Sequence, residues 1–141
     1  MNNRLGELKK GIRAFFPNYT TEGLTAYLAH AQDGKVFYSS CCCFVGGATA
    51  DHALQGRCDT NDYRHYQAAK NLPGADRAEA AFFDLGRPHF KHPIGTDGLK
   101  ADAQRRRVLI PMIKAELRRR AKQAEVVENE CEYALVHAVV R

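Results

Sequence analysis

The stretch LTAYLAHAQDGKVFYSSCCCFV, residues 24–45, decides which fold the sequence predicts. Two apolar runs, 24–32 and 35–45, flank Asp33 and Gly34, and Asp-Gly between such runs favours a two-residue β-hairpin turn. The second run is rich in aromatic, β-branched and cysteine side chains, so it is predicted to be a strand. The first run also suits a helix, and the sequence leaves open whether residues 24–32 are strand or helix.

The end of the chain supplies a further candidate strand. Val, Tyr and Leu alternate with other residues over 129–140, and both faces of such a strand would be mostly covered. We expect this segment to pair beside 35–45 in a small antiparallel sheet of two or three strands (24–32, 35–45 and 129–140). Four or five helices would pack on that sheet, so the predicted fold class is α+β.

The predicted helices include a long one over residues 99–126. Taking 100° per residue, Leu109, Ile113 and Leu117 fall on one face, and four basic side chains fall on the opposite face. These four are Arg107, Lys114, Arg118 and Lys122, and they are flanked by Arg105, Arg106, Arg119 and Arg120. Pro111 lies on the basic side, where we expect it to kink the helix without ending it.

Length and composition limit the domain count and the class of protein. The 141 residues suit a single globular domain, 1–141, and 45% of them are hydrophobic and 26% charged. No run approaches the roughly 20 continuous apolar residues that a membrane span needs, so no membrane partner is expected. The first residues, MNNRLGELKKGIRAFF, lack the features of a secretory signal and instead predict an amphipathic helix.

The net charge of +5 is unevenly distributed along the chain. Residues 101–125 hold eight basic and three acidic side chains, whereas residues 126–141 hold one basic and three acidic. The basic face of helix 99–126 could therefore attract nucleic acid through its phosphates. The helix lacks interleaved aromatic residues and any nucleic-acid-binding motif. We therefore favour a solvated face, or one that pairs with the acidic VVENECE segment here or in a second subunit.

The cysteines indicate a reducing compartment. There are five, an odd number, and three of them are adjacent, which is a poor framework for disulfides because neighbouring residues rarely meet the required geometry. Reduced thiols and a cytoplasmic location are therefore the expectation.

The cysteine triplet also raises a thiol or metal hypothesis. In a strand, Cys41 and Cys43 would share one face and Cys42 would point to the other, so the three could not hold one ion together. The candidate zinc ligands are therefore Cys41 and Cys43 with Cys58, His52 and His65, whose spacing lacks the usual C-x₂₋₄-C pair. The candidate nucleophile is Cys43, with His52, His65 or His137 as its base, but no family signature surrounds it. Close packing of small side chains in the core is the favoured interpretation.

The sequence contains no P-loop, Rossmann fingerprint, HExxH or G-x-S-x-G motif, and no cofactor is expected. We expect a non-enzymatic binding or assembly module that acts through protein contacts, with a homodimer among its forms. Nucleic-acid binding through Arg107, Lys114, Arg118 and Lys122 is the first alternative. A thiol- or metal-dependent site around Cys41 and Cys43 is the second.

Overall fold

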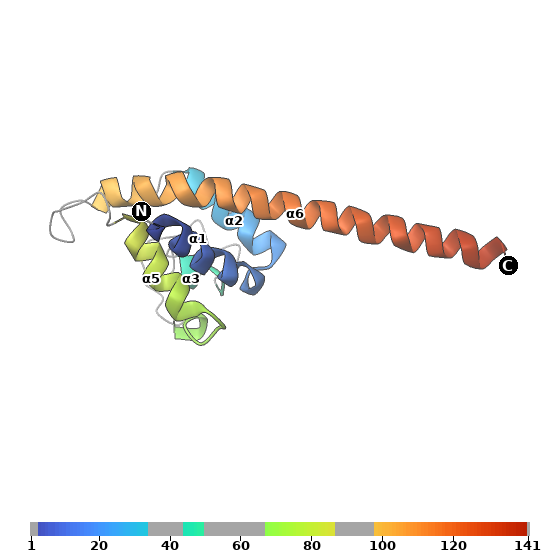
Figure 1. Cartoon of the computed structure of the whole chain (residues 1–141), viewed down its shortest axis with the longest axis horizontal. Coiled ribbons are helices and arrows are strands. Elements are labelled where there is room, and N and C mark those ends of the chain that lie inside the picture. The colour runs from blue at the N-terminus through green and yellow to red at the C-terminus, as the bar shows by residue number, and fades with distance from the viewer. Residues whose placement is uncertain (1–2, 34–43, 50–66, 87–97, 141) are drawn as a thin grey trace.

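The computed structural model describes residues 3–33, 44–49, 67–86 and 98–140. The regular elements in these ranges are helical: α1 (Arg4–Phe15), the 3₁₀ turn η1 (Phe16–Asn18), α2 (Thr21–Gln32), α3 (Phe44–Gly47), α5 (Ala75–Gly86) and α6 (Gly98–Val140). No strand occurs in this part of the chain (Figure 1). The predicted α+β class is therefore wrong, and the described protein is helical.

Residues 24–32 belong to α2, so the hairpin prediction is wrong for them. Thr20 caps this helix, since its side-chain oxygen accepts a hydrogen bond from the backbone N–H of Gly23 at 2.9 Å. The buried side chains then recur at helical spacing along one side: Leu24, Tyr27, His30 and Ala31. The N-cap and the helical spacing of the buried side chains favour a helix more strongly than Asp-Gly favours a hairpin turn. Asp33 is accordingly the C-cap of α2.

Residues 129–140 form the C-terminal end of α6, so the predicted third strand is also wrong. The helix predicted over 99–126 is present, but it continues past 126 to Val140 and passes Pro111 on its exposed side. Adding a residue to an existing helix forms a hydrogen bond with no nucleation cost. Strand propensity, by contrast, depends on packing against a neighbouring strand, and the described residues contain none.

Of the predicted strand 35–45, only Phe44 and Val45 lie within the described residues, and both are in the short helix α3. All four residues of α3 are buried. A Cβ atom on Gly47 would lie 2.5 Å from the Tyr19 hydroxyl oxygen and 2.8 Å from a ring carbon of Tyr27. The glycine therefore permits close packing of α3 against two tyrosines.

The core lies among α1, α2, α3, α5 and the first half of α6. Helix α1 packs on α5, and α6 packs on both α2 and α5. The fully buried large side chains from these helices are Ile12, Phe15, Leu24, Tyr27, Phe44, Phe82, Leu85, Leu109 and Ile113. Leu109 and Ile113 come from the face of α6 that the sequence predicted to be apolar, so this face holds α6 against the other helices.

The C-terminal half of α6 extends beyond the other helices (Figure 1). At 1.5 Å per residue its 43 residues span about 65 Å. Residues 121–135 are exposed on every side of the helix. The exposed side chains there include large apolar ones: Val126, Val127, Tyr133 and Leu135. Half of the longest helix therefore has no part in the core of the described chain.

Candidate interaction surface

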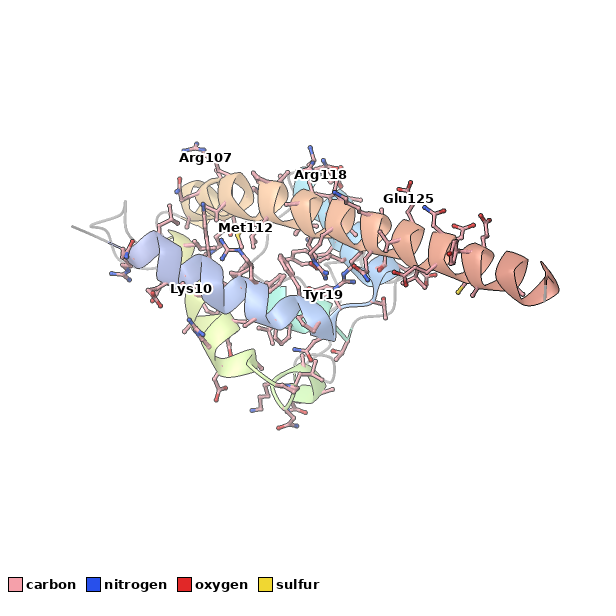
Figure 2. The ribbon with its side chains drawn as sticks, turned by 45° about the vertical axis from the view of Figure 1, so that its right-hand side comes forward. Lys10, Tyr19, Arg107, Met112, Arg118 and Glu125 are labelled. Carbon is pink, nitrogen blue, oxygen red and sulfur yellow. The ribbon has the colours of Figure 1, made fainter. Side chains whose placement is uncertain are left out.

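The four basic residues proposed for nucleic-acid binding lie on one side of α6. Arg107, Lys114, Arg118 and Lys122 are all exposed, because Leu109 and Ile113 on the other side hold the helix against the core. Arg107 and Arg118 project away from the other helices, as Figure 2 shows. The helical period alone brings these four side chains together.

Acidic residues continue the same line beyond the core. Figure 2 shows Glu125 on the same side of α6 as Arg107 and Arg118, and steps of three or four residues lead from it to Glu132. We call this line the outer stripe; it consists of Arg107, Pro111, Lys114, Arg118, Lys122, Glu125, Asn129 and Glu132. Its charges are all positive from Arg107 to Lys122 and all negative from Glu125 to Glu132.

Two exposed apolar side chains border the acidic half of the outer stripe. Val126 is 42% exposed and Tyr133 is 66% exposed, and each follows a glutamate of the stripe directly in the sequence. A protein-contact surface combines apolar area with charges around it. The acidic half of the stripe has both components on one exposed helix.

Two arginines that the sequence placed beside the basic face are instead part of the fold. Arg105 is 3% exposed and lies between α5 and α6, where its guanidinium contacts the Asp102 carboxylate at 2.8 Å. Arg120 is mostly buried and joins α6 to the connection between α1 and α2. Its guanidinium donates to the backbone oxygens of Phe16 at 2.7 Å and Tyr19 at 2.9 Å. Neither guanidinium is available to a partner's phosphates.

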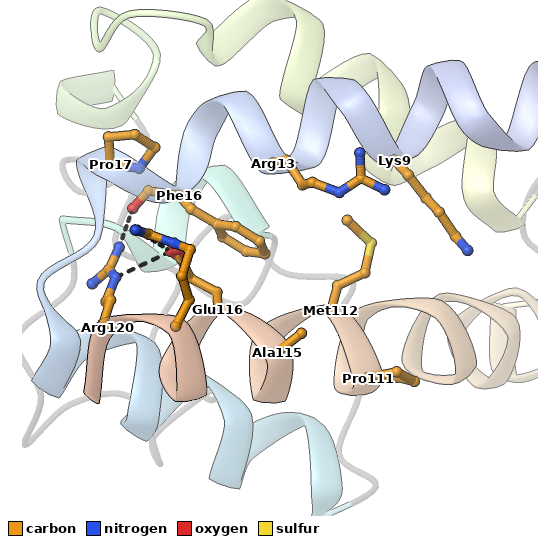
Figure 3. A pocket seen from close by; sticks show the side chains of 10 residues that line it. Lys9, Arg13, Phe16, Pro17, Pro111, Met112, Ala115, Glu116 and Arg120 are labelled. Carbon is orange, nitrogen blue, oxygen red and sulfur yellow. Dashed lines mark hydrogen bonds and ion pairs between the residues drawn. The ribbon is translucent and has the colours of Figure 1, made fainter. Parts of the chain in front are cut away.

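The carboxylate of Glu116 binds the guanidinium of Arg120 (Figure 3) and that of the neighbouring Arg119. Arg119 donates to it from Nε at 2.7 Å and from Nη2 at 3.0 Å, and Arg120 donates from Nε at 3.3 Å. The Glu116 side chain is only 9% exposed. The hydrogen bonds from Arg119 are the main reason that the pKa of Glu116 is lowered, and Arg120 lowers this pKa further. The same contact raises the pKa of Arg119.

We expect Glu116→Gln to lower the free energy of unfolding at pH 7 by about 1–2 kcal/mol, because charge-assisted hydrogen bonds are lost. The pKa of Glu116 is lower in the folded than in the unfolded chain, where it is about 4.3. Its stabilising contribution is therefore complete above that value and disappears as the pH falls through the lower, folded value. Urea unfolding of both proteins at pH 7, 5 and 3 tests this. A difference in stability that stays constant with pH would contradict it.

The residues of the thiol and metal hypothesis lie outside the described residues: Cys41, Cys43, Cys58, His52 and His65. Within the described ranges, no group of three His, Cys, Asp or Glu side chains could hold a metal ion. Cys131 is an exposed thiol on the projecting half of α6. The thiol and metal hypothesis therefore stays a prediction.

The sequence interpretation missed the acidic continuation of the basic face and the two arginines of the fold. The continuation follows from the helical period once the helix is extended past 126. The Asp102–Arg105 spacing of three residues was visible as a helical pair, but its burial depends on α5.

None of the described helices combines the length and apolar character needed to span a membrane. The chain matches no family model, no curated protein and no solved structure.

Proposed function

We propose that this protein is an assembly module that forms a homodimer through the outer stripes of two α6 helices. The observation that supports the proposal is the division of one exposed helix face into a basic half and an acidic half. Self-association through a two-fold axis requires a surface that is complementary to itself. A stripe with opposite charges at its two ends meets that requirement when the two copies run antiparallel.

The register of such a pair follows from the spacing along the outer stripe. With the two-fold axis near Lys122, Arg118 of one copy faces Glu125 of the second, and Lys114 faces Glu132. Each contact occurs twice, once on either side of the axis. A parallel pair would place like charges opposite each other along the whole stripe, whereas the antiparallel pair does so only at Lys122 beside the axis, so the charges favour the antiparallel orientation.

The apolar residues beside the stripe supply the remaining contact area. In this register Tyr133 of one copy lies near Pro111 of the other, and Val126 lies close to the axis. Burial of these exposed side chains stabilises the dimer by roughly 25 cal/mol for each Å² removed from water. Exposed ion pairs each add about 0.2–1 kcal/mol, so the charges contribute orientation more than affinity.

We expect Glu125→Lys with Glu132→Lys to weaken self-association by at least about tenfold, because four attractive contacts in the dimer become repulsive. Adding Lys114→Glu and Arg118→Glu to the same chain should restore it, since the outer stripe is then complementary again with its charges reversed. Sedimentation velocity at low and high salt measures both, with circular dichroism to verify that each variant is folded.

The variant with four substitutions is the control. If it self-associates and the variant with two does not, the loss is due to the charges and not to the number of substitutions. Salt should weaken the dimer of the wild-type protein and of the restored variant alike. If the wild-type protein is a monomer at every concentration at low salt, the proposed function is wrong. Equal association of all three proteins would place the contact elsewhere on the molecule.

Nucleic-acid binding is the second candidate, and the exposure of Arg107, Lys114, Arg118 and Lys122 on one side of α6 favours it. Glu125 and Glu132 on the same stripe would repel phosphates, so it ranks below the homodimer. Salt-sensitive binding of labelled generic DNA or RNA by the wild-type chain, lost on charge reversal of the four cations, would support it instead.

A cytoplasmic location belongs to the same proposal. Its support is the cysteine content of the sequence, with five cysteines of which three are adjacent, which suits reduced thiols. An assembly role of this kind involves no catalytic step.

A further inference from the structure

A pocket of about 640 Å³ lies between α1 and α6, beside the start of η1 (Figure 3). This volume is in the range of sites that hold small molecules. Its wall is partly apolar, with Phe16 at 4% exposure, the half-buried Met112, and Ala115. Because Ala115 has a small side chain, α6 leaves the pocket open at this point. An apolar group inside it would contact an aromatic ring and a flexible thioether.

The charged side chains of the pocket are mostly positive. Four basic residues line it, namely Lys9, Arg13, Arg119 and Arg120, against the single carboxylate of Glu116. That carboxylate is already held by Arg119 and Arg120. The pocket therefore has a net charge of +3 and would favour an anion.

Lys9 and Arg13 are the cations available to such an anion. They stand one helical turn apart on α1, and Figure 3 shows Lys9 reaching toward α6 and Arg13 lying along α1 on the side that faces Met112. Among the described residues, no hydrogen bond or ion pair engages either side chain. An ammonium and a guanidinium at this spacing can both donate to one carboxylate, the guanidinium with two parallel hydrogen bonds.

We infer that this pocket binds a small amphipathic carboxylate. Lys9 and Arg13 hold the carboxylate, and its apolar body lies against Phe16, Met112 and Ala115. The inference goes beyond the proposed function, since the outer stripe contributes only Pro111 to the pocket wall, and Lys9, Arg13 and Phe16 lie on α1 and η1. A neutral amphiphile lacks the partner for the two cations, and a small polar anion lacks the apolar body.

Isothermal titration of the full chain with octanoate tests this, because octanoate joins a carboxylate to a flexible apolar chain. We expect saturable binding to one site per chain. Octylammonium, octan-1-ol and acetate should each bind at least about tenfold more weakly, since each lacks one of the two required features. Absence of saturable octanoate binding, or equal binding of octylammonium, would overturn the inference.

Three variants assign the binding to this pocket. Lys9→Gln with Arg13→Gln should weaken octanoate binding at least about tenfold, and Ala115→Phe should do so by filling the pocket with all charges retained. Arg4→Gln with Lys10→Gln removes two charges from the same helix away from the pocket and should leave the affinity within about twofold. If Ala115→Phe leaves binding intact, or if both double variants lower the affinity equally, octanoate binds elsewhere and the inference is wrong. Sedimentation velocity of the same variants measures their self-association, so a loss of octanoate binding can be told apart from a loss of the homodimer.

Discussion

Replacing Arg105 with methionine is expected to lower the free energy of unfolding by about 3–5 kcal/mol, because it removes one partner of a buried ion pair. Methionine occupies a similar volume but carries no charge. The Asp102 side chain is 1% exposed and lies 2.8 Å from this guanidinium, so we expect it to remain buried without a cation in the variant. A buried carboxylate that loses its cation is far more costly than the same carboxylate in water.

The position of Arg105 between two helices adds to this cost. Its Nε donates to the backbone oxygen of Phe82 at 2.8 Å and its Nη2 to that of Phe83 at 3.2 Å. Both oxygens are near the C-terminal end of α5, where the helix dipole favours a cation. The guanidinium also lies 5.0 Å from the centre of the Phe82 ring, within reach of a cation–π interaction. One side chain thus joins α5 to α6.

Equilibrium unfolding in guanidinium chloride measures the effect, and Arg107→Met is the matched control. Arg107 is exposed two residues later on the same helix, so its replacement should change the free energy by no more than about 0.5 kcal/mol. Adding Asp102→Leu to Arg105→Met should recover part of the loss, since two apolar side chains then face each other. If Arg105→Met and Arg107→Met unfold at the same denaturant concentration, Arg105 is not the buried link between these helices.

The amphipathic part of α6 could be predicted from sequence because one local period decides it. Leu109 and Ile113 are buried and Lys114 and Arg118 are exposed, as helical spacing requires. The segment 129–140 could not be assigned in this way. Its apolar residues lie on several sides of a helix and also alternate like those of a strand, so neither period stands out. The segment is helical because it continues the helix that precedes it.

The candidate surfaces were predictable only in part. Repetition at helical spacing was enough to place Arg107 and Lys122 on one exposed face. The same repetition said nothing about Arg105 and Arg120, which share the residue type of that face but reach backbone oxygens of α5 and of the α1–α2 connection. The pocket could not be predicted for the same reason, since Lys9 and Met112, which both line it, are about a hundred residues apart in the chain. Contacts between distant segments have no local period.

Phe44→Ala is expected to lower the free energy of unfolding by about 3–5 kcal/mol, the usual cost of emptying a core position of this size. The Phe44 side chain is fully buried. Its ring centre lies 5.2–5.8 Å from those of four other aromatic residues, Phe15, Phe16, Tyr19 and Tyr27. These come from α1, η1, α2 and the residue that follows η1, so a cavity at Phe44 separates elements that meet around this ring.

The residues around Phe44 have little room to move into the cavity that Phe44→Ala leaves. The expected loss in the free energy of unfolding is therefore at the upper end of the range for core substitutions. The Tyr19 hydroxyl donates to the Phe44 backbone oxygen, and Gly47 leaves no space between α3 and the two tyrosines. Phe44→Leu should cost only about 1–1.5 kcal/mol, because leucine fills most of the same volume. Leu5→Ala, at a side chain 47% exposed, should change the stability by no more than about 0.5 kcal/mol. Urea unfolding of the three variants gives the order, and a Phe44→Ala chain as stable as Leu5→Ala would mean that α3 does not lie in the core.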